Sequence, residues 1–531
     1  MLCDGNLRWR HFQDNLYIDK ASGLMLDLSR MRLPADFWPK LAPRLQQALA
    51  EMRLQEAGVA DEQGIMAGHF WLRAPELAPE PQIALAISTA WQEIAALAEK
   101  VHGGYLRGED GEFFSRLLLI GVGGSCQGTR FISRALSGTA HKMRLFFLDN
   151  TDPDGMEEVL AALKPLLKQT LVAVVSKSGA TLETLNSMRA TAAFFQADNL
   201  NFARHAISVS AVGSALDEQA SAEGWLARFH VPDWLSGRFS LCSAVGLLPL
   251  ALQGVDIDAL LASAARMDVL TGQSCLWENP AALLAGACFS LTGEGNNSQL
   301  VLLPYKDCLD YLPHYLQQLL MESIGKEYER NGRRVCQGLT LYGNKGSSDQ
   351  HSFLQQLLAG PDNFCALFVE VLSRAHATSL MMGDPSAIAD ALEASLLATR
   401  QLLSTAGRRS MTITLPAVDA ARLGAFLALW ERAVGLAAAL LNLNAYDQPA
   451  VEQIKLALPP MLALKTSIVA FLADGGGQAF TLEQIMAALD ADSDYENIFK
   501  WLRYLTADPD SHVRLRSGVN ICQDSYYYQH E

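Results

Sequence analysis

The chain has 531 residues, of which 50% are hydrophobic and 19% are charged, and its formal net charge is −15. A chain of this length exceeds one hydrophobic core and its composition is typical of globular proteins, so we expect at least two folded domains. The acidic balance argues against nucleic acid or an anionic membrane as the main partner, because cations are needed to offset phosphate repulsion. A small anionic substrate is compatible with it, since a few local donors can outweigh the overall field.

The cysteines and histidines give no sign of a metal site or of disulfides. The nine cysteines are odd in number, scattered and never in a CxxC pair, which predicts reduced thiols. The eleven histidines form no HxxH or HxxxH pair, so neither zinc nor another metal is expected. MLCDGNLRWRHFQDN lacks a signal-peptide core, and no unbroken apolar run is long enough to cross a bilayer. We therefore expect a cytoplasmic protein without metal or cofactor.

The first predicted domain has the alternating pattern of a parallel sheet. Residues 1–105 are expected to be mainly helical and to pack on the core. After them, short apolar runs alternate with longer amphipathic segments, which is typical of strands joined by crossover helices. These runs are 117–120, 145–148, 171–175 and 206–209. The pattern predicts a doubly wound α/β domain over residues 106–270.

A second series of the same kind follows. Its apolar runs are 300–303, 339–342, 365–371 and 411–415, which predicts a second α/β domain over residues 271–465. Residues 466–531 look like two short helices and a tail, a winged-helix-like segment that lacks a basic stripe and is not expected to bind DNA. The predicted fold class is therefore α/β, with two tandem doubly wound parallel-sheet domains and flanking helical segments.

Two predicted strand-to-helix loops have the character of an anion site. GVGGSCQGT follows the run at 117–120, and VVSKSGATLET includes the end of the run at 171–175. Both bring glycine, serine and threonine to a helix N-terminus, where backbone N–H groups and hydroxyls favour a phosphate. In an open α/β sheet such loops share the carboxyl edge of the strands, where ligands bind. The second loop adds Lys177.

The first loop alone leaves other readings open. GVGGSCQG contains G-x-G-x-x-x-x-G instead of the dinucleotide fingerprint G-x-G-x-x-G, and Asp149 is a weak match for the ribose-binding acid. An ordinary tight turn would also fit this loop. Two such loops on neighbouring strands are more specific than one, so we favour a site for a phosphate monoester.

Four further stretches each contain a lone ionisable residue. SGRFSLCSAVG contains Arg238, HYLQQLLMESIGKEYERNG contains Glu322, GSSDQHSFLQQLLAG contains His351, and NLNAYDQPAVEQIK contains Lys455. Taken singly, each has a structural explanation. Glu322 and Lys326 are i and i+4 on a predicted helix and could form a surface pair. Arg238 could belong to a structural ion pair, His351 could cap a helix, and Lys455 could be solvated.

Taken together, these stretches resemble the glucose-6-phosphate isomerase (phosphoglucose isomerase) family, in a divergent bacterial form, with the sugar isomerase (SIS) fold. LNLNAYDQPAVEQIK resembles the family's C-terminal signature, MESIGK its Met-Glu-Ser-Asn-Gly-Lys helix, and DQHSF its Gly-Gln-His-(Ser/Ala)-Phe loop. GGS and SKSGATLET resemble its phosphate loops, and all motifs stand in family order between about residues 115 and 460. The chain departs from the family pattern at Gly179, Ser236, Ile324, Asp349 and Ala450.

The resemblance implies an aldose-ketose isomerase that interconverts D-glucose 6-phosphate and D-fructose 6-phosphate, in glycolysis and gluconeogenesis, without metal or cofactor. It implies that Glu322 is the base that moves a proton between C2 and C1. Arg238 would stabilise the enediolate, and His351 and Lys455 would open the ring. The implied substrate-binding residues are Gly124, Ser125, Ser176, Lys177, Ser178, Thr181, Gln318 and Gln448. The resemblance also implies a homodimer in which His351 reaches the site across the interface.

Three other functions are compared with the isomerase. A non-catalytic sugar-phosphate-binding protein would keep the loops but has no reason to keep the four charged residues together. An amidotransferase-type hexosamine isomerase would need a glutaminase domain with an N-terminal cysteine. Cys3 is near the start, but residues 1–100 do not have the sequence pattern of a glutaminase domain. A dehydrogenase is disfavoured by the incomplete dinucleotide fingerprint.

Overall fold

The computed structural model describes residues 2–61, 64–138, 142–292, 299–373, 385–490 and 494–529. The chain forms two compact units, Met1–Asp447 and Gln448–Glu531. Both large sheets lie within the first unit, and the second unit begins at Gln448. The division after residues 105, 270 and 465 stays a prediction.

The first sheet consists of five parallel strands in the order β4-β3-β5-β6-β7. The strands are β3 (Arg116–Ile120), β4 (Arg144–Leu148), β5 (Thr170–Val175), β6 (Ala206–Ser210) and β7 (Ala227–His230). The sequence predicted the first four, and all four are confirmed. It did not predict β7, a short edge strand in which only Phe229 is buried.

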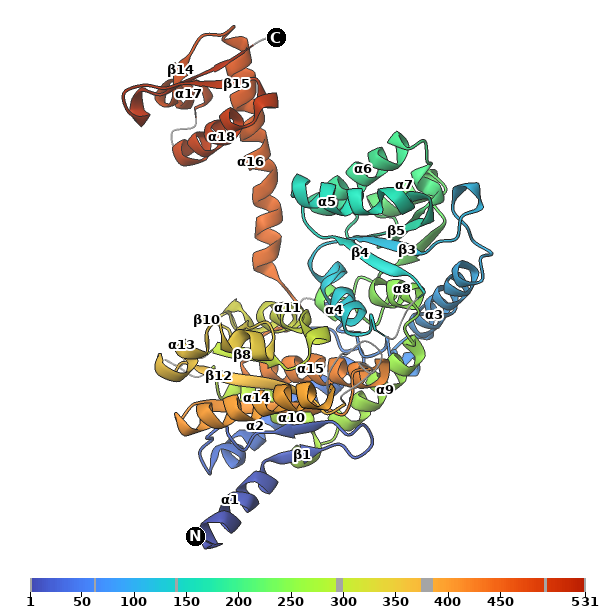
Figure 1. Ribbon diagram of the computed structural model, residues 1–531, viewed down its shortest axis with the longest axis vertical. Coiled ribbons are helices and arrows are strands. Elements are labelled where there is room, and N and C mark those ends of the chain that lie inside the picture. The colour runs from blue at the N-terminus through green and yellow to red at the C-terminus, as the bar shows by residue number, and fades with distance from the viewer. Residues whose placement is uncertain are drawn as a thin grey trace. The chain divides into compact units, whose positions relative to one another are not determined.

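Helices cover both faces of this sheet (Figure 1). Leu117 and Leu119 of β3 pack in one hydrophobic cluster with α4 (Gln127–Ala135) and α8 (Ala244–Gln253). Leu118 and Ile120 point to the other face, in a cluster with α5 (Pro153–Leu163), α6 (Leu182–Ala197) and α7 (Ala215–Ala222). Because successive strand residues point to opposite faces, a strand buried on both sides appears in the sequence as an unbroken apolar run.

The strand order places a topological switch point between β3 and β5. From β3 the chain crosses to β4 on one side and then to β5 on the other, and both neighbours pair with β3 in parallel. At such a point the loops after the two central strands diverge and leave a crevice at the carboxyl edge, which is where open α/β sheets bind ligands. The two predicted phosphate loops are the loops after β3 and β5.

The second sheet has six strands in the order β1-β2-β13-β12-β8-β11. Its parallel strands are β8 (Gln299–Pro304), β11 (Thr340–Tyr342), β12 (Phe364–Val371) and β13 (Arg409–Leu415), all at predicted positions. The edge differs from the prediction, because the N-terminal segment adds a hairpin of β1 (Leu16–Ile18) and β2 (Met25–Asp27), with β2 antiparallel to β13. The segment 1–105 is mainly helical, as expected, and the hairpin is an addition that the sequence analysis did not predict.

The first unit also contains a group of helices packed around the buried helix α15. The helices not yet given are α1 (Leu2–Asp14), α2 (Phe37–Glu56), α3 (Pro81–His102), α9 (Ile257–Thr271), α10 (Pro280–Phe289), α11 (Leu312–Ile324), α12 (Gly346–Gln350), α13 (Leu354–Ala359), α14 (Pro385–Thr405) and α15 (Ala420–Leu440). A two-stranded ribbon joins β9 (Lys326–Tyr328) to β10 (Arg334–Gln337). The helix α15 is buried along most of its length and packs on α2, α9, α10 and α11.

A buried ion network ties this group of helices together. Arg73 lies 2.8 Å from Asp268 of α9 and 2.5 Å from Glu431 of α15. Arg432 of α15 lies 2.8 Å from Asp268 and also pairs with Glu56 of α2. Burial raises the pKa of Glu431 to about 7, against the attraction of Arg73. Within the residues that the structure describes, four separate segments therefore converge on one desolvated cluster of charges.

The second unit has its own small core. It contains α16 (Pro449–Asp474), β14 (Phe480–Thr481), α17 (Leu482–Leu489), α18 (Tyr495–Ala507), β15 (Val513–Arg516) and β16 (Ser525–Tyr528). The three strands form an antiparallel sheet in the order β14-β16-β15. The core is formed by Ile468, Leu472, Ile485, Ile498, Leu502, Leu505, Val513 and Tyr526. The predicted pair of helices is present, and the predicted tail is a sheet.

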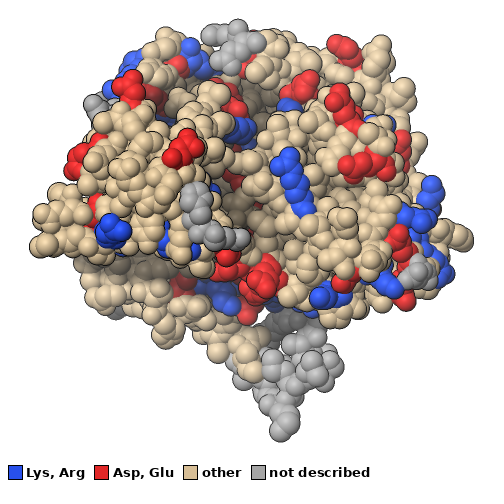
Figure 2. Space-filling view, turned by 90° about the horizontal axis from the view of Figure 1, so that it is seen from above, with Lys and Arg blue, Asp and Glu red and all other residues tan. Residues whose placement is uncertain are grey.

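Among the residues that the structure describes, two helices are long and apolar enough to cross a membrane, by length and composition alone. One is α15, whose apolar window is 94% buried inside the first unit, as in the core of a globular protein. The other is α16, whose window is 11% buried and which contains Pro459 and Pro460. The sequence expectation concerned unbroken apolar runs, and it is not contradicted, because both helices contain charged residues. In Figure 2 basic and acidic side chains are interspersed over the face shown.

Candidate active site

The loops after β3 and β5 lie side by side at the switch point. Register pairs Ile120 with Val174, so the first residues of the two loops are neighbours. In the first loop η3 (Gly123–Ser125) leads into α4. In the second, the Ser176 hydroxyl donates to the Thr181 hydroxyl at 3.2 Å, across the turn that opens α6. The structure therefore brings Gly124, Ser125, Ser176 and Thr181 to one edge of the sheet, as predicted for the anion site.

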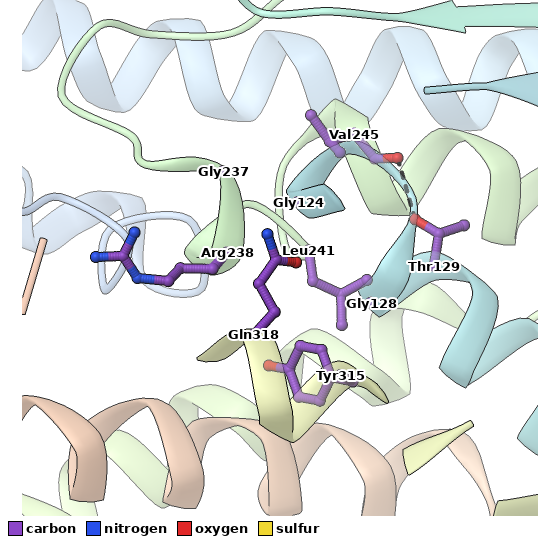
Figure 3. A pocket seen from close by; sticks show the side chains of 9 residues that line it. All are labelled: Gly124, Gly128, Thr129, Gly237, Arg238, Leu241, Val245, Tyr315 and Gln318. Atoms are coloured by element: carbon purple, nitrogen blue, oxygen red, sulfur yellow. Dashed lines mark hydrogen bonds between the residues drawn. The ribbon is translucent and has the colours of Figure 1, made fainter. Parts of the chain in front are cut away.

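Gly124 allows two loops to touch. A Cβ atom on this residue would lie 2.3 Å from the carbonyl carbon of Gly237, so only glycine fits. Gly237 begins η6 (Gly237–Phe239), which contains Arg238. This close approach sets the backbone of η6 beside the loop after β3 (Figure 3).

Local geometry also requires glycine at position 179, in the loop after β5. Its φ of +65° lies in the left-handed region, and a Cβ atom would meet the Ser214 hydroxyl oxygen at 2.8 Å. Glycine is therefore the residue that this turn accommodates without strain. The side chain of the exposed Ser178 accepts a hydrogen bond from the Ala180 N–H at 3.3 Å, within the same turn.

Lys177 is held by the protein itself. Its ammonium group donates to the carbonyl oxygens of Asp233 and Leu235 at 2.8 and 3.0 Å. Burial lowers the pKa of Lys177. These bonds hold the segment that leads into η6, so Lys177 connects the loop after β5 to the loop that contains Arg238.

Arg238 is the buried cation of the site, with 3% of its surface exposed. Its Nε donates to the Ser323 hydroxyl at 2.8 Å, and its Nη1 lies 3.4 Å from Glu322 Oε2. Its Nη2 donates to the carbonyl oxygens of Asp447, at 2.9 Å, and of Ala445. Burial lowers the pKa of Arg238, and Glu322 and Asp447 oppose this effect. The guanidinium is therefore fixed in orientation, with one edge toward the carboxylate.

Glu322 lies in the last turn of α11, where its side chain is 27% exposed and so open to a ligand. Gln318, one turn earlier, donates to Glu322 Oε1 at 3.2 Å. Figure 3 shows the Gln318 amide pointing from α11 toward the backbone of Gly124 and Gly237. Both carboxylate oxygens are thus held, one by an amide and one by Arg238, and the carboxylate faces the site in one orientation.

The structure corrects one interpretation and adds two residues that the sequence analysis missed. Lys326 does not form a surface pair with the Glu322 carboxylate. It is 8% exposed, and its Nζ donates to the main-chain oxygens of Glu322, at 2.8 Å, and Asp447, at 2.7 Å. Ser323, the fully buried partner of Arg238, was also missed. Both lie inside the MESIGK motif, which was the only available signal.

His351 lies apart from these hydrogen bonds. It follows α12, its side chain is exposed, and its N–H donates to Ser348 at 3.1 Å. The neighbouring Asp349 is buried and accepts from the N–H groups of Asn344 and Lys345 at 2.8 and 3.1 Å. The bonds of Glu322 and Arg238 given above do not include His351.

Gln448 and Lys455 belong to the second unit. Gln448 stands at the N-cap position of α16, directly after Asp447, whose main chain is held by Arg238 and Lys326. Lys455 lies in the second turn of α16, half exposed, and its Nζ lies 2.7 Å from Glu452. Both residues are thus close in the chain to the anchored segment.

Comparison with known proteins agrees with this architecture. Residues 77–461 match the family model of phosphoglucose isomerase. The chain is 44% identical over 512 residues to a glucose-6-phosphate isomerase from Desulfitobacterium hafniense, covering 96% of each chain, and 46% identical over 521 residues to one from Geobacter sulfurreducens, covering 98% of each. The crystal structure of a glucose-6-phosphate isomerase from Chlamydia trachomatis superposes with a TM-score of 0.77 at 24% identity and 94% coverage of each chain, which shows the fold. The chain belongs to the phosphoglucose isomerase family.

Proposed function

We propose that this chain interconverts D-glucose 6-phosphate and D-fructose 6-phosphate by ring opening and proton transfer through an enediolate. The observation that carries the proposal is the pairing of Arg238 with Glu322, at 3.4 Å, beside two hydroxyl-bearing loops at the switch point. A carboxylate can exchange a proton with carbon, and a fixed cation can stabilise the negative charge that results. The hydrogen moves within one molecule, so the reaction consumes no oxidant.

The phosphate group is proposed to bind at the loops after β3 and β5. The hydroxyls of Ser125, Ser176, Ser178 and Thr181 supply donors, and the starts of α4 and α6 supply a favourable dipole. Gly124 keeps the first loop close to Arg238. Lys177 contributes positive charge while its Nζ is bonded to main-chain carbonyls. The bound phosphate then fixes the distance from the sugar's C1 and C2 to Glu322.

Glu322 is proposed as the base and Arg238 as the cation that stabilises the intermediate. The carboxylate takes the proton from C2 of the open aldose, the electron pair forms the C1–C2 double bond, and the carbonyl oxygen becomes the anionic oxygen of the enediolate. Arg238 lowers the energy of that anion, because its charge is already oriented and largely desolvated. The hydroxyl proton on O2 moves to O1, the proton on Glu322 returns to C1, and the ketose carbonyl forms at C2. Gln318 holds the carboxylate in line during both transfers.

Ring opening needs a second acid and base. We assign these roles to His351 and Lys455, and a pocket-lining role to Gln448. The exposure of His351 at the end of α12 suits a residue that completes the site of a second copy, so the proposed assembly is a homodimer. Asp447 is anchored near Glu322, and Lys455 is only eight residues further along the chain, which supports its role. We further propose that the enzyme acts in the cytoplasm, in glycolysis and gluconeogenesis.

A non-catalytic sugar-phosphate-binding protein is not favoured. Such a protein needs the phosphate loops but not a partly exposed carboxylate with both oxygens oriented beside a buried guanidinium.

The test is a direct assay of the purified chain with fructose 6-phosphate in D2O. Glucose 6-phosphate is measured after quenching, and NMR follows deuterium at C1 and C2. The proposal expects glucose 6-phosphate to form. It expects deuterium at the carbon that receives the proton if the proton held by Glu322 exchanges with D2O before it is returned to the sugar. It also expects loss of both signals in Glu322→Gln. Binding of fructose 6-phosphate without conversion would support the sensor instead, and unphosphorylated fructose serves as the control substrate.

A further inference from the structure

Lys326 is a buried cation at the end of the helix that contains the base. The helix α11 ends at Ile324, Gly325 leaves the helical conformation, and Lys326 begins β9. Only 6% of its side chain is exposed, and burial lowers the pKa of its ammonium group. A buried charge of this kind costs free energy unless all its hydrogen bonds are used.

Three oxygen atoms surround the ammonium group, which donates to two main-chain oxygens and forms an ion pair with one carboxylate oxygen. One is the main-chain oxygen of Glu322 at 2.8 Å, an orphan carbonyl in the last turn of α11. The other two belong to Asp447: its main-chain oxygen at 2.7 Å and its carboxylate Oδ1 at 2.8 Å. One side chain therefore joins the backbone of the proposed base to the last residue of the first unit.

Asp447 is also held by Arg238. Its main-chain oxygen accepts from Arg238 Nη2 at 2.9 Å as well as from Lys326. Arg238 in turn faces Glu322 with its Nη1. The result is a closed ring of contacts from Glu322 through Lys326 and Asp447 to Arg238 and back to Glu322. A shift of any one member displaces the cation or the carboxylate.

We propose that Lys326 is a positioning residue of the isomerase, which fixes the backbone of Glu322 and the Asp447 carbonyl so that base and enediolate-stabilising cation keep one mutual geometry. The proposal rests on the proposed function. The polar contacts given for Lys326 are with Glu322 and Asp447 and with no residue of the loops proposed to hold the phosphate. Its loss should therefore affect proton transfer and leave substrate anchoring intact.

The first test is a kinetic comparison of Lys326→Met with the wild-type chain. Because a misplacement of about 1 Å at reacting groups can cost on the order of 100-fold in rate, we expect kcat to fall roughly 10- to 100-fold. KM for fructose 6-phosphate should change less than threefold, since ground-state anchoring is unaffected. The matched control is Lys40→Met, which removes an exposed lysine that pairs with Asp36 on α2, and should change neither constant. The wild-type assay tests the proposed function separately.

A cycle of variants separates positioning from general stability. Asp447→Asn should lower kcat less than Lys326→Met, because the main-chain acceptor is retained. The double variant should be no slower than Lys326→Met alone, since the two residues act as one unit. Lys326→Arg keeps the charge and should recover part of kcat, and it serves as the informative variant if Lys326→Met does not fold.

A purely structural role predicts different results. Thermal midpoints would fall while kcat of the folded enzyme stayed within twofold of wild type, in Lys326→Arg as well as Lys326→Met. That pattern, or additive losses of kcat in the double variant, would overturn the proposal. A rise in KM with kcat unchanged would also overturn it.

Discussion

Arg238 Nη1 lies 3.4 Å from Glu322 Oε2, so a guanidinium that is almost fully buried faces a carboxylate that is partly open to solvent. The two residues are 84 positions apart in the chain and come from η6 and α11. Their pairing is asymmetric, because the cation is also held by Ser323 and two carbonyls, whereas the carboxylate keeps room for a ligand. The cation is therefore the fixed partner, and the carboxylate is the one that we propose to react.

The first prediction concerns this carboxylate. Glu322→Gln keeps the shape and the bond from Gln318 but cannot accept a proton, so kcat should fall by about 10²- to 10⁴-fold. KM should stay within a few-fold of wild type, because the phosphate loops are untouched. Steady-state kinetics, with fructose 6-phosphate binding measured by calorimetry, checks both expectations. Unchanged turnover would remove Glu322 from the role of base.

The second prediction concerns the phosphate loop after β5. Ser176 and Thr181 are joined by a hydroxyl–hydroxyl bond of 3.2 Å, and each hydroxyl can turn toward a phosphate oxygen. The double variant Ser176→Ala with Thr181→Ala should mainly raise KM, by roughly tenfold or more, since hydrogen bonds to charged groups contribute about 1.5–3 kcal/mol each. A fall in kcat with KM unchanged would show that the phosphate binds elsewhere.

The sequence predicted the central strands well and the edges poorly, for a physical reason. Leu117, Leu118, Leu119 and Ile120 are all fully buried, so β3 appears as an unbroken apolar run. The hairpin β1–β2 has strands of three residues, too short for a period of two to be seen, and it forms because β2 can pair with the exposed edge of β13. That partner lies almost four hundred residues away.

The same limit applies to the site. The motifs around Arg238 and Glu322 indicated both residues as candidates. The i, i+4 spacing of Glu322 and Lys326, however, fits a solvated surface pair as well as it fits a buried lysine. Lys326 is buried because it contacts Asp447, which lies 121 positions later in the chain. No local sequence pattern contains that contact. The sequence could likewise not indicate that Lys177 would bond to the carbonyls of Asp233 and Leu235.

The third prediction concerns the close contact of two loops. Gly124→Ala would place a Cβ atom 2.3 Å from the backbone of Gly237, so the loops must separate at a cost of about 1–3 kcal/mol. Since Arg238 follows Gly237, kcat should fall together with the thermal midpoint. The control is Gly155→Ala, within α5, where the nearest atom would be 3.7 Å away and helix propensity favours alanine. Wild-type kinetics in Gly124→Ala would contradict this account.

The fourth prediction concerns pH and the buried ion network. Burial raises the pKa of Glu431 from 4.5 to about 7, so the folded state binds its proton more tightly than the unfolded state does. Its contribution to stability is fully present below about pH 4.5 and is lost as the pH rises toward 7. Glu431→Gln should therefore flatten the dependence of unfolding free energy on pH between 4.5 and 7. Urea titrations at several pH values measure this, and an equal slope in both proteins would contradict it.

The last prediction concerns the independence of the second unit. Its core is separate from the clusters of the first unit, and Ile498 of α18 is fully buried in it. Ile498→Ala should cost about 2–5 kcal/mol within this unit alone, because the loss of buried methyl groups leaves a cavity. Hydrogen exchange should then rise in peptides from residues 464–529 and stay unchanged in β3, β5 and α11. Leu456→Ala, at a position of α16 that is 75% exposed, is the control and should change neither set. Faster exchange in β3 after Ile498→Ala would show that the two units unfold as one, contrary to the separation of their cores.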